Sequence, residues 1–426
     1  MILKNCRFIL TQDPKRRVLE NCDIRIEDDK IAEIAPNIKE RDDKVDFSKK
    51  VVMPGMINTH VHLPMTLFRG YSDNLGLHDW LKKMMAEEAK LTAEQVYWGT
   101  MLGCLESLQF GTTTAADFYY YPYERAKAVE KMGLNAFLDS TVLDKPFFFK
   151  DAQEAINHSE KFIKDMQEYK KITPVATCHS IYLCGTDTLE KIRDISNKYN
   201  VIRRIHVSET ERELKASLKN NKATPIEYLN KLDWLDDKTM LVHCNWATNM
   251  ELRMIRDKGC KINHNPVSNM KLAYGKAMPL KKMLEMGITV SLATDGPTSN
   301  NNLDLFDDMK VSALMHKFEL NDPMGIPDQD IFDMGNIQGA KALKITDKTG
   351  SIEPGKWADL IAMDVNKPHF TPLNKNNSIL SHIIYCSSGQ DVSETMVRGK
   401  FLVREGKFTN CNPEEIMSKV QELMGD

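Results

Sequence analysis

Eight short apolar runs recur through the middle of this chain and constrain its fold more than any other feature. They read VVMPGMIN, TTTAADF, NAFLDST, TPVATCHS, VIRRIHVSE, TMLVHC, CKINHNP and GITVSLATD, and amphipathic helical stretches such as 92–110, 151–170 and 186–200 separate them. Strands that are buried on both faces have this continuous apolar character, so eight β-then-α units predict an α/β fold, a (β/α)8 TIM-like barrel. The alternative is a doubly wound open sheet, which usually has fewer strands, and the glycine fingerprint of its dinucleotide-binding forms is absent.

The two ends of the chain carry a different pattern, in which apolar and polar residues alternate. It occurs in segments 2–10 and 22–36 and again in 359–365 and 395–408, where a hairpin is expected to turn at Arg398-Gly399-Lys400. Such alternation is typical of half-buried antiparallel strands. The sequence therefore predicts a small β-sandwich domain built from residues 1–52 and 351–410, with a barrel domain of residues 53–350 between them.

The last stretch, residues 411–426, is expected to form a helix that packs on the body of the protein. Asn412 is a suitable N-cap and Pro413 suits the first helical position. Ile416, Val420 and Leu423 form one apolar stripe for this contact.

Composition excludes several classes of protein. With 42% hydrophobic residues, 27% charged residues, a net charge of −3 and a pI near 6.4, the chain is typical of a globular protein that binds neither nucleic acid nor a membrane. The nine cysteines are scattered without CxxC pairs, which argues against a disulfide framework or a thiolate zinc site. We expect a reduced, cytoplasmic protein that acts on a small molecule, and a homo-oligomer stays open.

Histidines recur at the ends of the predicted strands. They are His60 and His62 after the first strand, His179 after the fourth, His206 after the fifth, His243 after the sixth and His264 late in the seventh, while Asp295 follows the eighth. The carboxyl ends of barrel strands open onto one face, where active sites lie. The other histidines, at 78, 158, 316, 369 and 382, fall in predicted helices or loops, and we interpret them as packing or surface residues.

The His60-x-His62 spacing predicts half of a metal site, because residues two apart on a strand point to the same side. His206 and Asp295 would supply a third nitrogen and a carboxylate oxygen, a set that suits one Zn²⁺ or Fe²⁺. Such a set leaves room for a water molecule, whose pKa the ion lowers toward ~7. Two buried histidines that happen to lie close are the alternative interpretation of this spacing.

Three of these strand-end residues are candidates for proton transfer. Glu209 follows His206 by three positions, in HVSET, and from there it can face a substrate as a general acid and base. The alternative is a solvent-exposed loop glutamate. His243 and Asp295 would share the proton of the bound water, with Asp295 acting both as metal ligand and as base.

Several segments together resemble the amidohydrolase superfamily, and within it the 5-methylthioadenosine/S-adenosylhomocysteine deaminase family. They are 54–81 (PGMINTHVHLPMTLFRGYSDNLGLHDWL), 206–210 (HVSET), 241–246 (LVHCNW), 263–280 (NHNPVSNMKLAYGKAMPL), 292–310 (LATDGPTSNNNLDLFDDMK) and 350–364 (GSIEPGKWADLIAMD). The resemblance implies a single metal, normally zinc, held by His60, His62, His206 and Asp295. It also implies an enzyme that hydrolyses the C6 amino group of an adenosine-type nucleoside, giving the inosine analogue and ammonia.

The resemblance assigns two further substrate contacts. His179 stands where many binuclear relatives have a carboxylated lysine, so a second metal is not expected, and the matching family histidine contacts the nucleoside. Glu88 matches a glutamate that binds the ribose hydroxyls, a role that suits a carboxylate facing a vicinal diol. Its alternative interpretation is an exposed glutamate at the start of a helix. In the same family Glu209 and Asp295 also contact the reacting base.

One departure from the family concerns the 5′ end of the substrate. Family members that accept S-adenosylhomocysteine present arginines after the third strand, but here Ser140 stands near one such place, and only Lys145 and Lys150 offer a positive charge. The aromatic run 147–149 would favour an apolar group. We therefore expect methylthioadenosine, 5′-deoxyadenosine or adenosine rather than S-adenosylhomocysteine.

Two other functions compete with nucleoside deamination. The chain can be a deaminase or hydrolase of a free nucleobase, a pterin or an s-triazine, or a metal-binding protein without catalytic activity. Residues 63–90 are long enough to form a lid over the site, which the sequence does not decide.

Overall fold

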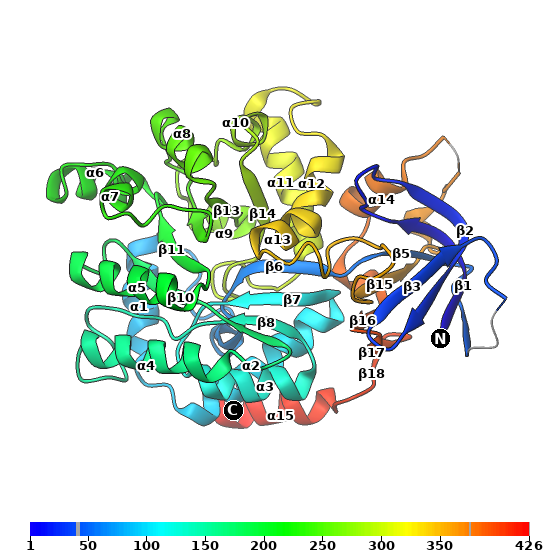
Figure 1. Cartoon of the computed structure of the whole chain (residues 1–426), viewed down its shortest axis with the longest axis horizontal. Helices are drawn as coiled ribbons and strands as arrows, with labels where there is room; N and C mark the ends of the chain where they lie inside the picture. The colour runs from blue at the N-terminus through cyan, green and yellow to red at the C-terminus, as the bar shows by residue number, and fades with distance from the viewer. Residues whose placement is uncertain (40–42, 375, 426) are drawn as a thin grey trace.

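The computed structural model describes residues 1–39, 43–374 and 376–425. Figure 1 shows a barrel surrounded by helices, with a sheet beside it that is built from both ends of the chain. The α/β barrel with an added sheet domain is thus confirmed. The barrel strands are β6 (Met56–Val61), β7 (Thr112–Asp117), β8 (Asn135–Leu138), β9 (Ile172–Pro174), β10 (Ala176–Ser180), β11 (Arg203–Val207), β12 (Thr239–His243), β13 (Lys261–His264) and β14 (Thr289–Leu292).

The barrel closes from two parallel sheets, β6 to β9 and β10 to β14. Only Val175 separates β9 from β10, so the two are halves of one broken strand: β9 pairs with β8 and β10 pairs with β11. Single bridges join the sheets at both seams, between Val142 and Cys178 and between Val61 and Asp295. The bridge to Asp295 holds the end of the eighth strand beside the first.

Helices cover the outside of the barrel, and their apolar faces explain why the strands are buried on both sides. The helix that starts at Ala93 begins with the capping box expected at Thr92 and Gln95. The helices of this layer are α1 (Leu77–Glu88), α2 (Ala93–Gln109), α3 (Pro122–Met132), α4 (Ala152–Met166), α5 (Thr186–Tyr199), α6 (Glu211–Asn220), α7 (Pro225–Lys231), α8 (Asn249–Lys258), α9 (Pro266–Lys271), α10 (Leu280–Glu285), α11 (Leu305–Leu320), α12 (Asp328–Gly335) and α13 (Ile337–Ala342), with the 3-10 helix η1 (Leu63–Phe68) before α1.

The second sheet joins the two ends of the chain in one hydrogen-bonded path, β18-β17-β16-β15-β5-β1-β2-β3, with β4 paired to β1. The hairpin expected near Arg398 is present between β16 and β17. The predicted boundary between residues 52 and 53 falls inside β5. The domain boundaries stay a prediction. The elements are β1 (Ile2–Leu10), β2 (Val18–Glu27), β3 (Lys30–Ala35), β4 (Lys44–Asp46), β5 (Lys50–Pro54), β15 (Leu360–Asp364), β16 (Val392–Val397), β17 (Lys400–Arg404) and β18 (Lys407–Phe408), with η2 (Pro368–Phe370), α14 (Ile379–Tyr385) and η3 (Gly389–Asp391) between β15 and β16.

Gly55 alone separates β5 of this sheet from β6 of the barrel. A Cβ atom built at Gly55 would lie 2.1 Å from Oγ1 of Thr113, so no other residue fits between the sheet and β7. The close packing fixes the start of the strand that carries His60 and His62.

The C-terminal helix α15 (Pro413–Met424) lies against α2. The Asn412 side chain caps it by accepting a hydrogen bond from the Glu414 amide at 3.1 Å, and Ile416 and Val420 are buried. Asp426, the last residue of the segment for which this helix was expected, lies outside the described residues. No helix in the described part of the chain is both long and apolar enough to span a bilayer.

Candidate metal centre and active site

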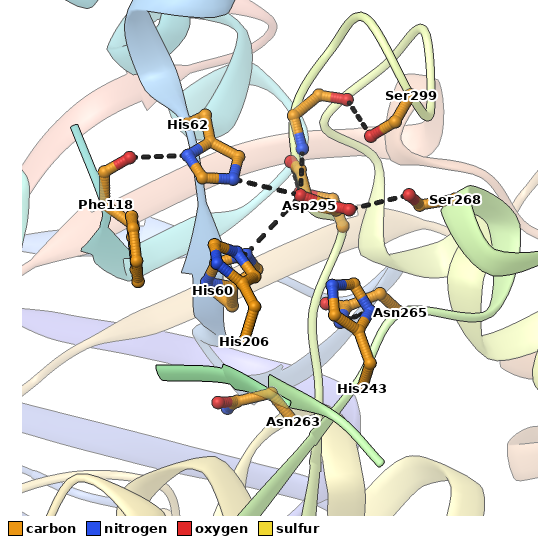
Figure 2. A network of polar contacts seen from close by, with 12 residues as sticks. His60, His62, Phe118, His206, His243, Asn263, Asn265, Ser268, Asp295 and Ser299 are labelled. Atoms are coloured by element: carbon orange, nitrogen blue, oxygen red, sulfur yellow. Dashed lines mark hydrogen bonds and ion pairs between the residues drawn. The ribbon is translucent and has the colours of Figure 1, made fainter. Parts of the chain in front are cut away.

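Four side chains from three strand ends meet at the mouth of the barrel (Figure 2). The Nε2 atoms of His206 and His60 are 3.2 Å apart. Oδ1 of Asp295 lies 3.1 Å from Nε2 of His62 and 3.4 Å from Nε2 of His60. Ligand atoms held about 2.0–2.1 Å from one tetrahedral zinc ion lie about 3.3–3.4 Å from each other. The ligand atoms of the three histidines lie within 4.8 Å of one another and Asp295 contacts two of them, so the set suits a single small cation.

Hydrogen bonds set the ring orientation of two of the histidines. Nδ1 of His206 lies 2.8 Å from the carbonyl oxygen of His179, and Nδ1 of His62 contacts the carbonyl oxygen of Phe118. Because a carbonyl oxygen can only accept, each Nδ1 carries the proton and each Nε2 turns a lone pair toward the centre. This is the tautomer that a metal-binding histidine needs.

The charge states of the donor set also fit a cation. Burial lowers the pKa of His206 well below its usual value and that of His60 to about 3, so both rings are neutral ligands. Burial would raise the pKa of Asp295, but the contacts with His60 and His62 outweigh this effect and hold that pKa well below its ordinary range. The set thus contains two neutral imidazoles, one carboxylate and His62, whose pKa burial would lower but the contact with Asp295 raises.

The backbone is strained where the strands end at this site. Ser208, His243 and Asp295 all have positive φ angles, of 51°, 76° and 65°. L-residues rarely adopt this conformation, and it costs of order 1 kcal/mol or more for each residue. The strain turns the chain sharply at the end of each strand and brings the side chains of His243 and Asp295 to the mouth.

Glu209 and His243 form a second group of side chains next to the donors. Oε1 of Glu209 lies 3.3 Å from Nε2 of His243. The same carboxylate accepts hydrogen bonds from the hydroxyls of Tyr274 and Tyr182, the latter at 3.2 Å. Glu209 is 3% exposed, so it is not a solvent-exposed loop residue, and burial raises the pKa of its carboxyl group.

A pocket opens above these groups. Its wall is formed by apolar side chains of η1 and α1 and by aromatic residues of the neighbouring loops. The polar groups described above that line it are His62, Tyr182, His206, Glu209, His243, Tyr274 and Asp295. The apolar and aromatic lining residues are Met65, Leu77, Trp80, Leu81, Met84, Met85, Phe118, Tyr119, Tyr120, Leu272 and Tyr274. Residues 63–90 therefore supply one wall of the pocket. No lysine or arginine of the described chain lines it.

The structure places Glu88 and His179 in the wall of this pocket. Glu88 is the last residue of α1 and is 5% exposed, so it is not an exposed glutamate at a helix start. Burial raises the pKa of Glu88 to about 7. His179 lies on β10, and burial lowers its pKa to about 3, which leaves a neutral ring at neutral pH.

His264 and the remaining histidines lie away from the pocket lining. His264 is buried beneath the site, where its Nε2 lies 3.1 Å from Nε2 of His316, also buried. Ser268, Tyr182 and Tyr274 are site residues that the sequence pattern did not predict. Ser268 and Tyr274 occur in the segment 263–280 that carries the family resemblance, but their spacing gives no sign of which carboxylate each one contacts.

Comparisons with known proteins agree with this arrangement. Residues 51–402 match the model of the amidohydrolase family. The chain is 38% identical over 426 residues to a 5′-deoxyadenosine deaminase of Methanosarcina mazei, with 99% of this chain and 97% of that protein covered. It is 34% identical over 435 residues to a 5-methylthioadenosine/S-adenosylhomocysteine deaminase of Caldanaerobacter subterraneus subsp. tengcongensis, again with 99% and 97% covered.

A solved structure has the same fold. The crystal structure of an adenosine deaminase from Xanthomonas campestris with bound zinc superposes with a TM-score of 0.95 at 25% identity, covering 99% of this chain and 97% of that one. The match to the family model spans most of the chain, and the relatives align over nearly its full length. This chain therefore belongs to the amidohydrolase family.

Proposed function

We propose that this protein is a zinc-dependent deaminase that hydrolyses the C6 amino group of an adenosine-type nucleoside. The observation that carries the proposal is the meeting of a four-donor metal centre with a buried glutamate, Glu209, on the floor of one pocket. The names of the two relatives and of the solved neighbour support a nucleoside as substrate. Zn²⁺ is the proposed ion, and Fe²⁺ is the alternative that suits the same donors.

The reaction consumes water and releases ammonia, leaving an inosine-type product. His60, His62, His206 and Asp295 would hold a cation, which would supply an acidified water molecule. Glu209 donates a proton to N1 of the adenine ring, which makes C6 electrophilic, and its raised pKa favours the protonated form that this step requires. His243 and Asp295 hold the proton of the water as it adds to C6. Unrelated zinc nucleobase deaminases also use a non-ligand glutamate.

Glu88 and His179 are proposed to bind the nucleoside. The carboxylate of Glu88 can accept hydrogen bonds from the 2′ and 3′ hydroxyls of the ribose. His179 lines the same pocket, and its Nδ1 has no hydrogen-bond partner among the described residues. A free base has no ribose diol, so the buried position of Glu88 favours a nucleoside over a free base.

The 5′ end of the substrate is proposed to be apolar. Neither Lys145 nor Lys150 lines the pocket, and Ser140 is engaged by His158, whose Nδ1 lies 3.0 Å from its hydroxyl. The aromatic run at 147–149 does not line the pocket; two of its rings pack behind Tyr120, which does. We therefore propose 5′-deoxyadenosine, methylthioadenosine or adenosine as substrates and rank S-adenosylhomocysteine below them.

An ammonia-release screen on protein of measured metal content tests the proposal. Its arms are 5′-deoxyadenosine, methylthioadenosine, adenosine, S-adenosylhomocysteine, guanine, cytosine, a pterin and an s-triazine. Release from the adenosines alone is the expected result. Release only from a free base, pterin or triazine would replace the nucleoside with that compound, and no release from any arm would support a metal-binding protein without catalytic activity.

We also propose the cytoplasm as the place of this reaction. All nine cysteines are unpaired, and seven of them are buried, which suits a reducing compartment.

A further inference from the structure

One segment of the chain contacts all three groups that the proposed reaction uses to move protons. This segment, residues 265–276 (NPVSNMKLAYGK), follows β13 and includes α9. Ser268 donates its hydroxyl hydrogen to Oδ2 of Asp295 at 2.6 Å, and Tyr274 donates to Oε1 of Glu209. The third contact joins Oδ1 of Asn269 to Nδ1 of His243, at 2.9 Å.

We propose that residues 265–276 form a positioning segment, and that Asn269 in particular fixes the tautomer of His243 so that Nε2 presents a lone pair to the active site. The inference rests on the proposed deaminase function for its catalytic consequence, but the tautomer itself is a property of the folded protein. Asn269 is a positioning residue, because it acts on the reaction through His243.

The direction of the contact between Asn269 and His243 follows from a chain of hydrogen bonds that begins at a backbone carbonyl. The carbonyl oxygen of Lys276 can only accept, so the group 3.2 Å from it is the side-chain NH2 of Asn245. The oxygen of Asn245 then accepts from the NH2 of Asn269 at 2.9 Å. Asn269 must therefore turn its oxygen toward His243, which requires a proton on Nδ1.

Asn265 also lies beside the ring, with its amide nitrogen 3.1 Å from Nδ1 of His243 (Figure 2). Its oxygen has no hydrogen-bond partner among the described residues. The two ends of an asparagine amide are assigned from their partners, and among the described residues the side-chain amide of Asn265 has only His243 as a partner. His243 thus sets the direction of Asn265, whereas Asn269 is fixed independently by Asn245 and the Lys276 carbonyl.

The positioning segment is attached to the loops on both sides, which keeps these contacts in register. The indole NH of Trp246, after β12, donates to the carbonyl oxygen of Tyr274 at 3.0 Å. The ammonium group of Lys271 donates to the carbonyl oxygen of Thr298, after β14, at 3.2 Å. The segment therefore connects the ends of the sixth, seventh and eighth strands.

The test compares Asn269→Leu with Asn269→Asp in the full-length, zinc-loaded protein. Long-range ¹H–¹⁵N spectra of ¹⁵N-histidine-labelled protein report which ring nitrogen carries the proton, and the signals lost in His243→Gln identify His243. We expect Nδ1–H in the wild type and in Asn269→Asp, whose carboxylate still accepts, and a mixture of tautomers in Asn269→Leu.

Kinetics with the nucleoside that the screen identifies give the second measurement. We expect kcat of Asn269→Leu to fall by roughly 10- to 100-fold, at or below the low end of the about 100- to 10,000-fold that general acid–base catalysis contributes, because part of the population keeps the productive tautomer, with KM within about threefold of the wild type. The kcat of Asn269→Asp should be at least about tenfold higher than that of Asn269→Leu. The matched control is Asn249→Leu, at an exposed asparagine whose side chain accepts a hydrogen bond from Lys282 at 2.6 Å; it should leave the His243 signals and kcat unchanged.

Three outcomes would overturn the inference. They are a wild-type His243 protonated on Nε2 alone, an unchanged tautomer in Asn269→Leu, or equal losses of kcat in the two Asn269 variants. If Asn269→Leu does not fold, Asn245→Leu replaces it, since that change releases the direction of Asn269 without touching the ring. The spectra can be recorded without turnover, so they test the tautomer independently of the deaminase activity. A failed deaminase assay would refute the proposed function, and the spectra alone would still decide whether Asn269 fixes the tautomer.

Discussion

Replacing Glu88 by glutamine tests the proposed ribose contact most directly. The Glu88 side chain is buried in the pocket wall at the end of α1, so the replacement keeps its size and removes its charge. A carboxylate can accept both ribose hydroxyls, whereas the amide keeps one acceptor oxygen. A hydrogen bond to a charged group contributes ~1.5–3 kcal/mol. The loss of one such bond corresponds to a fall in kcat/KM of about 10- to 150-fold for a ribonucleoside.

The pKa of Glu88 adds a pH dependence with a definite sign. Burial raises this pKa to about 7, so the carboxylate is mostly ionised above pH 7 and mostly protonated below it. Protonation removes acceptor capacity, and the advantage of wild type over Glu88→Gln should therefore be largest at pH 8 and shrink toward pH 6. At pH 7 the advantage of wild type over Glu88→Gln should be about half of its full value at high pH, because roughly half of the wild-type Glu88 side chains are protonated there.

The assay compares adenosine with 2′,3′-dideoxyadenosine at pH 6, 7 and 8. The ratio of their kcat/KM values cancels the titration of groups that act on the base, and it isolates the diol. Glu87→Gln is the matched control. Glu87 is the neighbour of Glu88 in the chain, but its carboxylate accepts a hydrogen bond from Lys90 at 2.9 Å and does not line the pocket. Equal losses for both substrates in Glu88→Gln, or a ratio that does not change with pH, would refute the ribose role.

Three further predictions concern the metal, the core and the 5′ end. His206→Ala should lose bound metal and ammonia release together, as measured by elemental analysis and a coupled assay. Removal of the metal from the wild-type protein by a chelator should lower its melting temperature, because an ion present at about 1,000 times its Kd stabilises the folded state by ~4 kcal/mol. Arg125→Ala should lower the free energy of unfolding by ~3–5 kcal/mol in urea titrations, because buried Asp117, 2.7 Å from its guanidinium, loses its counter-charge, and buried Asp139, at 3.3 Å, is left with Arg204 at 3.5 Å; a change below about 1 kcal/mol would contradict this. S-adenosylhomocysteine should have a kcat/KM at least about tenfold below that of 5′-deoxyadenosine, since no lysine or arginine of the described residues lines the pocket to offset a carboxylate, and comparable values would end the proposed apolar 5′ preference.

The local pattern of the sequence determined the architecture. Continuous apolar runs predicted the barrel strands, because strands buried on both faces have no polar side to show. The two-residue spacing predicted that His60 and His62 share a side of one strand, and the rule that barrel strands end on one face predicted that His206 and Asp295 would lie beside them. The capping box at Thr92 was equally readable, since its donors and acceptors are three residues apart.

The tertiary structure decided which groups contact each other across the site. Nothing in the spacing of Ser268, Asn269 and Tyr274 predicts that they reach Asp295, His243 and Glu209, which lie at or just after the ends of three other strands. The break between β9 and β10 at Val175 and the burial of Glu88 likewise depend on neighbours far away in the chain. The periodicity of apolar residues indicates only which side of a helix or strand is buried. Hydrogen-bond partners depend on how loops from different strands pack together, and only the folded chain brings those loops into contact.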